Sequence, residues 1–306
     1  MNIVLSAAAR TPTGAFRGEL SSVKASKLGA VAIEGAISRA GIEKSDVDLV
    51  FMGCVLQAGM GQAPARQAAL YAGLDQNTPA VTLNKMCGSG MEALLQAYRA
   101  VALGDARIAI AGGMESMSNA PYLLPGARGG LRMGNKEIID SMIHDGLWDV
   151  YNDQHMGSCA EPCATRYEFS REAQDEFAER SYRRAQEASG NGAFAREIVP
   201  VEVQGRRGQV TTVSEDEGPH NVDFEKMRKL RPAFENDGTV TAANASTIND
   251  GAAALVVTTE EVARERGMPI LARIGGYASS AGAPEMFTTA PVGAMNSLFD
   301  RTGWDA

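Results

Sequence analysis

Residues 79–111, PAVTLNKMCGSGMEALLQAYRAVALGDARIAIA, contain the alternation that decides the fold. A β-rich run at 79–84 is followed by a helical stretch at 90–103, which stops at Gly104, and by a second β-rich run at 107–111. Strands that alternate with helices form a parallel sheet covered by helices on both faces. The stretch therefore predicts an α/β layout.

The same alternation continues on both sides of this stretch. Apolar residues at helical or β spacing, bounded by glycine and proline, predict the further elements. Before it we expect strands at 3–5 and 47–55 and helices at 21–40, ending before Gly41, and 63–72. After it we expect a helix at 171–189 between Ser170 and Gly190, a β-like stretch at 198–213, strands at 252–258 and 270–274, and a helix at 292–303.

The pattern loosens between about residues 116 and 247, where glycine, methionine and proline loops predominate. We interpret this middle part as an excursion from the sheet, whose last strand returns at 252–258. The predicted domains are therefore an N-terminal α/β domain (1–118 and 248–268), an inserted loop domain (119–247) and the beginning of a second α/β domain (269–306).

Composition and charge exclude several classes of protein. With 29 basic and 37 acidic residues the net charge is −8, which argues against nucleic-acid binding. No apolar run approaches the ~18 residues that a membrane helix requires, and residues 1–5 are apolar without the basic leader of a secretory signal. Four cysteines are too few for a disulfide scaffold. We expect a cytoplasmic protein.

Cys87 is the most informative residue, because it lies in the turn between the expected strand and helix, within Asn84-Lys85-Met86-Cys87-Gly88-Ser89-Gly90. Unpaired N–H groups and the helix dipole favour a thiolate at such a position, and the glycines allow a substrate carbonyl to approach backbone donors. Two interpretations stay open at this point. The cysteine is a nucleophile for acyl transfer, or it is a buried structural residue.

Histidine is the usual base for a nucleophilic cysteine, and the chain has three, His144, His155 and His220. None has a spacing that marks it as the base. His155 precedes Ser158 and Glu161, whose spacing predicts a helix that begins with a capping box at Ser158.

The same segment also suggests a metal site. His155, Cys159 and Cys163 recur every four residues, so that one helix face could present them to a metal. No fourth ligand stands nearby in the sequence, and small apolar packing is the commoner use of such cysteines. We therefore expect no metal.

Two further features of the sequence are compatible with phosphate binding, but each also has a purely structural interpretation. Gly112-Gly113 follows an expected strand but lacks the full dinucleotide fingerprint. A basic region either forms a solvated face or meets phosphates; it comprises Arg206, Arg207, Lys226, Arg228, Lys229 and Arg231.

Several motifs, in order along the chain, resemble the signatures of the thiolase family, the acetyl-CoA acetyltransferases. The heptapeptide around Cys87 resembles the active-cysteine motif of that family. The other matching segments are Arg10-Thr11-Pro12, residues 61–67 (GQAPARQ), residues 111–118 (AGGMESMS), His155-Met156-Gly157, residues 229–234 (KLRPAF), Asn244-Ala245-Ser246 and residues 249–254 (NDGAAA).

The resemblance implies a thiolase fold, a layered α/β/α/β/α arrangement of two similar halves with a loop domain inserted in the first and the C-terminal half largely absent here. It implies an acyltransferase in which Cys87 takes the acyl group as a thioester and the backbone N–H of Cys87 is one oxyanion donor. Acyl-CoA and CoA are then substrates, no further cofactor is implied, and the family assembles as dimers or tetramers. By position, the residues implied to line the CoA path are Leu147, His155, Met156, Phe234 and Ser246.

The chain also departs from the family pattern. Thiolases carry Gly-His-Pro, Cys-x-Gly and Asn-Glu-Ala-Phe motifs in the second half, and none occurs in these 306 residues. Pro219 stands where better-known members have an arginine at the CoA phosphates. The main expectation is a thiolase acting on acetoacetyl-CoA or another 3-ketoacyl-CoA, because the loops around Met133 and Met156 resemble those of short-chain enzymes. The alternatives are a noncatalytic, truncated thiolase-like module that binds acyl-CoA or a partner, and, less favoured, a ketoacyl synthase.

Overall fold

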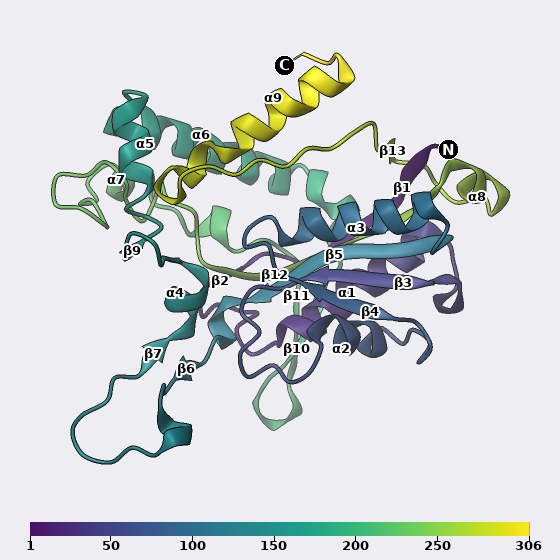
Figure 1. Ribbon diagram of the computed structural model, residues 1–306, viewed down its shortest axis with the longest axis horizontal. Helices are drawn as coiled ribbons and strands as arrows, with labels where there is room; N and C mark the ends of the chain where they lie inside the picture. Colours follow the sequence, from purple (N-terminus) through teal and green to yellow (C-terminus); the bar gives the residue numbers. More distant parts are fainter. Residues whose placement is uncertain (306) are drawn as a thin grey trace. The chain divides into compact units, whose positions relative to one another are not determined.

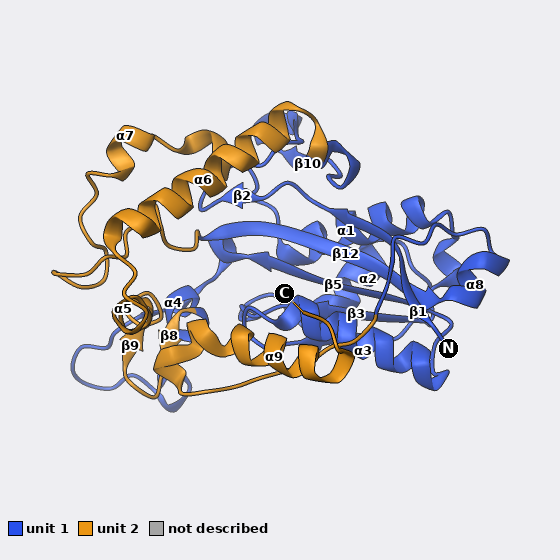
Figure 2. Cartoon of the chain, turned by 90° about the horizontal axis from the view of Figure 1, so that it is seen from above, with its two compact units in different colours: residues 1–146, 194–217, 248–274 blue, residues 147–193, 218–247, 275–306 orange. Residues whose placement is uncertain are grey.

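The computed structural model describes residues 1–305, which form two compact units (Figure 2). The first unit contains residues 1–146, 194–217 and 248–274; the second contains 147–193, 218–247 and the chain from Gly275 onward. Residues 119–146 and 194–217 thus lie in the unit that holds the sheet. The three-part division drawn from the sequence stays a prediction, and its last residue, Ala306, lies outside the described residues.

A seven-stranded sheet forms the centre of the first unit, with the order β13-β1-β12-β5-β3-β4 and the short β2 paired with β12. The strands are β1 (Ile3–Arg10), β2 (Gly14–Ala15), β3 (Leu49–Gly53), β4 (Ala80–Leu83), β5 (Ile108–Ser116), β12 (Asn249–Thr259) and β13 (Ala272–Arg273).

Helices cover both faces of this sheet, as the alternation predicts. In Figure 1, α3 (Ser89–Leu103) lies on one face, and α1 (Ala25–Ala40) and α2 (Pro64–Tyr71) lie on the other. The glycines expected to end two of these helices do so: Gly41 and Gly104 adopt left-handed φ angles of 68° and 83°. Glycine adopts this left-handed conformation with little strain, and the chain can therefore leave the helix at this position.

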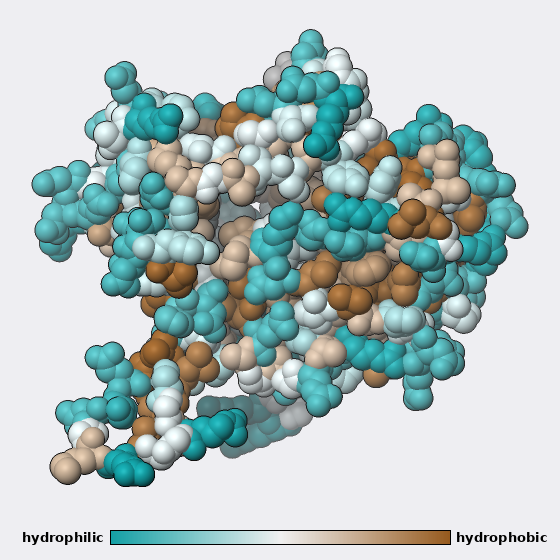
Figure 3. Space-filling model, in the orientation of Figure 1, coloured by the Kyte–Doolittle hydropathy of each residue, from teal (hydrophilic) through white to brown (hydrophobic). Residues whose placement is uncertain are grey.

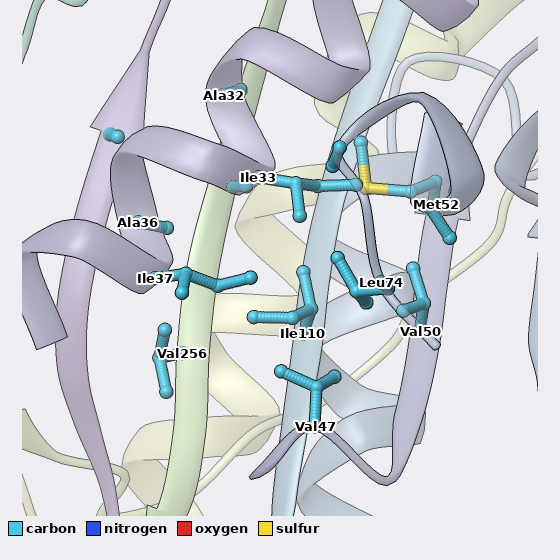
Figure 4. Close-up of a cluster of buried hydrophobic side chains, with 14 of the residues drawn as sticks. Ala32, Ile33, Ala36, Ile37, Val47, Val50, Met52, Leu74, Ile110 and Val256 are labelled. Atoms are coloured by element: carbon cyan, nitrogen blue, oxygen red, sulfur yellow. The ribbon is translucent and has the colours of Figure 1, made fainter. Parts of the chain in front are cut away.

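The core follows the alternation of side chains along the central strands. Ile110 of β5 and Val256 of β12 are fully buried against α1 (Figure 4), while their neighbours Ala109 and Val257 are buried against α3. Successive strand residues point to opposite faces, so these two strands must be apolar on both. This explains the continuous apolar run at 252–258 in the sequence.

The prediction of a parallel sheet is wrong for part of it. Strands β3, β4 and β5 are parallel to one another, but β12 runs antiparallel to both β1 and β5, and β13 runs antiparallel to β1. The fold is therefore α/β with a mixed sheet. A parallel neighbour of β5 would need a crossover that returns the chain to the end of the sheet where β5 begins. The long excursion instead brings the chain back where β5 finishes, so that Asp250 at the start of β12 pairs with Ser116 at the end of β5.

The remaining elements of the first unit lie outside the sheet. They are η1 (Lys44–Asp46), η2 (Met117–Asn119), β6 (Tyr122–Leu123), η3 (Ala127–Gly129), β7 (Ile139–Asp140), α4 (Ser141–Gly146), the hairpin of β10 (Val201–Gln204) and β11 (Val210–Val213) with η5 (Arg206–Gly208), and α8 (Glu260–Glu265). The hairpin confirms the β-like stretch expected at 198–213.

The second unit is mostly helical. Its long helix α6 (Arg171–Gly190) begins as predicted, because the hydroxyl of Ser170 accepts a hydrogen bond from the N–H of Ala173 at 3.2 Å. Its other elements are β8 (Trp148–Asp149), β9 (Gln154–His155), α5 (Ala160–Arg166), η4 (Ala193–Arg196, mostly in the first unit), η6 (Gly218–Asn221), α7 (Phe224–Met227), η7 (Pro284–Thr289) and α9 (Ala290–Thr302).

The face shown in Figure 3 is mainly hydrophilic, with hydrophobic residues in separate patches. Within residues 1–305, every helix is too short or too polar to cross a bilayer. Isolated exposed apolar side chains are normal on protein surfaces.

Candidate active site

Cys87 lies in a tight turn that joins β4 to α3, and its side chain is exposed. The interpretation of this residue as a buried structural cysteine is therefore wrong. The hydroxyl of Ser89 fixes the turn from inside, since it accepts from the N–H of Lys85 at 2.8 Å and donates to the carbonyl of Met86 at 2.6 Å. Met86 has a left-handed φ of 49°, which is uncommon for a residue other than glycine.

The turn places Cys87 two residues before the first residue of α3, at the N-terminal end of that helix. The helix dipole stabilises a negative charge at this end. Glu92, in the first turn, would oppose that charge, but Lys85 at 2.8 Å and Arg99 at 3.0 Å compensate it. The hydrogen bond from Lys85 is the main reason that the pKa of Glu92 is lowered to about 2.

Glycines bring the neighbouring strands close behind the turn. A Cβ on Gly53, at the end of β3, would lie 2.6 Å from the Cβ of Ser89, and a Cβ on Gly113 would lie 3.4 Å from the Cα of Gly90. A Cβ on Gly112 would overlap the carbonyl of Ala253 in β12. This close packing favours the structural interpretation of Gly112-Gly113, in which the glycines serve packing.

The other three cysteines differ from Cys87. Cys54 and Cys159 are buried, and burial raises the pKa of both thiols. The sulfur of Cys54 lies 3.6 Å from the carboxylate of Glu115, which adds to the shift. Cys163 is half-buried. Because reactivity requires a thiolate that solvent can reach, Cys87 is the cysteine best placed to act as a nucleophile.

Four of the five residues assigned to the CoA path are brought together in the second unit. The strands β8 and β9 pair, and the N–H of Met156 donates to the carbonyl of Leu147 at 2.8 Å. The ring of His155 stacks on that of Phe234 with centroids 4.9 Å apart. Ser246 is exposed, further along the same loop as Phe234. Cys87 belongs to the first unit.

The hydrogen bonding of His155 fixes its tautomer. The N–H of Gly157 donates to Nδ1 of His155 at 2.9 Å, so Nδ1 is unprotonated and the neutral ring carries its proton on Nε2. Burial lowers the pKa of His155, which also favours the neutral ring. The residue therefore offers one N–H donor from Nε2 beside the Phe234 ring.

The segment after His155 differs from the sequence prediction in two ways. Helix α5 begins at Ala160, with Cys159 at the N-cap position and no side-chain cap, so the capping box predicted at Ser158 is wrong. His155 lies in β9 and not on the helix, so His155, Cys159 and Cys163 do not share one helix face. Among residues 1–305 no group of three or more His, Cys, Asp or Glu side chains is placed to hold a metal ion.

The basic region is divided between the two units. Arg206 and Arg207 lie in the connection of the β10–β11 hairpin in the first unit. In the second unit Arg228 pairs with Glu179 at 2.7 Å and Lys226 with Asp223 at 3.1 Å. These pairs favour the interpretation of a solvated face.

Comparisons with known proteins agree with this arrangement. Residues 3–261 match the family model described as the N-terminal domain of thiolase. Acetyl-CoA acetyltransferase 2 of Arabidopsis thaliana is 51% identical over 300 residues, which cover 97% of this chain and 74% of the relative. Acetyl-CoA acetyltransferase of Pseudomonas aeruginosa is 47% identical over 304 residues, which cover 99% of this chain and 77% of the relative.

A solved structure shows the same fold. The crystal structure of the Acat5 thiolase from Ascaris suum, in complex with coenzyme A, matches with a TM-score of 0.94 and 40% sequence identity. The match covers all of this chain and 78% of that one.

Proposed function

The chain belongs to the thiolase family, and from that membership we propose that it is an acetyl-CoA C-acetyltransferase that makes or cleaves acetoacetyl-CoA or another 3-ketoacyl-CoA. The single observation that carries the proposal is the exposed Cys87 in the turn directly before α3. A thiol at such a helix end is suited to attack a thioester, because the negative charge of the thiolate is stabilised there.

In the proposed reaction the Cys87 sulfur attacks the carbonyl carbon of acetyl-CoA. A new sulfur–carbon bond forms and the bond to the CoA sulfur breaks. CoA leaves as a thiol, because it takes up the proton that the Cys87 thiol has lost. The exchange of one thioester for another is nearly balanced in energy, and a thiolate is both a good nucleophile and a good leaving group. In synthesis the acetyl group then passes to the carbanion of a second acetyl-CoA; in thiolysis the steps run in reverse.

The negative charge on the carbonyl oxygen during each attack needs hydrogen-bond donors. By resemblance to the family, the backbone N–H of Cys87 is one of them. The base that removes the proton of the second acetyl-CoA belongs, in the family, to motifs that these 306 residues do not contain. We propose that this part of the site lies in the second α/β half, within the share of the relatives' length that the match does not cover.

The second unit is proposed to hold the CoA substrate. Leu147 is hydrogen-bonded to Met156 through the backbone, and His155 stacks on Phe234; we propose that these four residues offer CoA a largely apolar surface with one N–H donor, Nε2 of His155. Such a surface suits the pantetheine arm, which alternates alkyl groups with amides. Ser246 is proposed to contact the same arm from the far end of the loop. CoA and acyl-CoA are substrates, and no further cofactor is proposed.

The cellular setting remains a proposal as well. We place the protein in the cytoplasm, in fatty acid metabolism, as a homo-oligomer of two or four copies, with neither nucleic acid nor membrane as a partner. The net charge of −8 supports the exclusion of nucleic acid.

Acetyl transfer to the protein tests the proposal. On incubation with [¹⁴C]acetyl-CoA we expect label on Cys87, recovered on its peptide, and no label in Cys87→Ser. Cys163→Ser serves as a matched control and is expected to label like the wild type. A folded protein that exchanges no acetyl group with acetyl-CoA would support the noncatalytic, CoA-binding alternative.

A further inference from the structure

The loop that carries Phe234 and Ser246 contains neither helix nor strand between them. Its backbone N–H and C=O groups therefore lack the regular partners that secondary structure provides, although buried groups of this kind need partners. A few backbone hydrogen bonds within the loop, such as that from the N–H of Ala233 to the carbonyl of Val240 at 2.9 Å, leave much of its shape to contacts with side chains.

Glu161 makes four of these contacts. Its side chain is on α5 and the residue is only 6% exposed. The N–H of Thr239 donates to both carboxylate oxygens, at 2.8 and 2.9 Å, and the N–H of Val240 donates to one of them at 2.8 Å. The Thr239 hydroxyl donates to the second oxygen at 2.8 Å. One carboxylate thus binds the middle of the loop with four hydrogen bonds.

Two further features show that the loop is shaped around this carboxylate. Gly238 lies directly against it, and a Cβ at that position would overlap Oε1 of Glu161. The Thr239 hydroxyl also accepts from Nε2 of Gln174 at 2.8 Å, so its proton is directed to Glu161. Further along, Nδ2 of Asn244 donates to the Asp175 carboxylate at 2.9 Å.

Glu161 also follows His155-Met156-Gly157 closely in the chain, and Phe234 stacks on His155 from the loop side. We infer that Glu161 is a positioning residue that holds Phe234 and its loop against His155, and so sets the geometry of the surface that takes CoA. The inference rests on the proposed function for its ligand, and Glu161 itself need not touch the substrate.

Removal of the carboxylate leaves the N–H groups of Thr239 and Val240 without an acceptor, which favours an alternative loop conformation. In Glu161→Ala we expect the chain to bind coenzyme A about tenfold more weakly or worse, and tenfold corresponds to ~1.4 kcal/mol. Glu161→Gln retains one acceptor oxygen and the same shape, so it is expected to recover part of the affinity.

The experiment uses the full 306-residue chain and isothermal titration with coenzyme A. Asp216→Asn is the matched control, because Asp216 is a similarly buried carboxylate (7% exposed) in the first unit that binds Arg10 and the N–H of Thr13. It is expected to lower stability but to leave the affinity for coenzyme A unchanged. Unchanged affinity in Glu161→Ala, or an equal loss in the control, would overturn the inference.

A second measurement does not depend on CoA binding. The imidazole protons of His155, assigned by comparison with His155→Asn, should carry a ring-current shift from Phe234 in the NMR spectrum. Glu161→Ala should move these signals while those of His144 and His220 stay in place. If the wild type fails to bind coenzyme A, the proposed function fails, and the His155 signals still decide the inference: unchanged signals in Glu161→Ala would refute it.

Discussion

The substitution Gly157→Ala tests the packing of His155 and Phe234 in the proposed CoA surface. A Cβ at residue 157 would overlap the ring of Phe234, which already stacks on His155 at 4.9 Å with an angle of 21° between the planes. The backbone of Gly157 cannot move away freely, because its N–H donates to Nδ1 of His155. The ring of Phe234 must therefore shift.

The cost has two parts. An extra methyl group in a packed site costs about 1–3 kcal/mol, and loss of an aromatic stack costs about 0.5–1.5 kcal/mol beyond the area it buries. Phe234 is half-buried, so part of the strain is relieved toward solvent. We therefore expect Gly157→Ala to lower the free energy of unfolding by about 1–3 kcal/mol and to weaken the binding of coenzyme A.

Urea unfolding and titration with coenzyme A measure both effects. Gly190→Ala is the matched control, because a Cβ there, at the last residue of α6, meets nothing within 4 Å. That control should be neutral or more stable by about 0.5–1 kcal/mol, as alanine is the better helix former. Equal stability and equal affinity of Gly157→Ala and the wild type would refute the packing described for Phe234.

Two further predictions concern the first unit. Burial raises the pKa of Glu115 above its ordinary value of 4.5, so between these two values the folded state holds a proton that the unfolded state has lost. The free energy of unfolding should therefore fall as pH rises through this window. In Glu115→Gln this contribution to the pH dependence should be absent from urea midpoints measured between pH 4 and 8. An unaltered pH dependence would contradict the account. Gly53→Ala should lower the urea midpoint, by about 1–3 kcal/mol in unfolding free energy, because its Cβ would press on Ser89. Gly129→Ala, where the Cβ meets open space, should not, and similar midpoints for both variants would show that this close approach is unimportant.

Local signals in the sequence predict local structure well. Gly41, Gly104 and Ser170 each mark a helix end by a conformation or a hydrogen bond that depends only on near neighbours, and all three do so in the structure. The turn at Cys87 is of the same kind, because Ser89 and the glycines that shape it lie within a few residues. The seven residues around Cys87 therefore predict the turn itself, but they left open whether the thiol is exposed, and the structure decides that question.

Other features depend on partners far away in the chain. The direction of β12 depends on where the long excursion returns to the sheet, and the apolar pattern of β12 itself does not predict it. Ser158 and Glu161 have the spacing of a capping box, but the Glu161 carboxylate binds Thr239, 78 residues further along. A carboxylate that satisfies two buried N–H groups and a hydroxyl of a loop gains more than one that caps a single N–H group. Only the tertiary structure decides between these partners.

The reactivity of the four thiols in the native chain measures the central claim most directly. Brief treatment with iodoacetamide, followed by peptide mass spectrometry, should modify Cys87 first and leave Cys54 and Cys159 unmodified until the chain is unfolded in urea. Prior incubation with acetyl-CoA should protect Cys87 alone. A native protein in which Cys87 resists alkylation as strongly as Cys54 would contradict the assignment of Cys87 as the nucleophile.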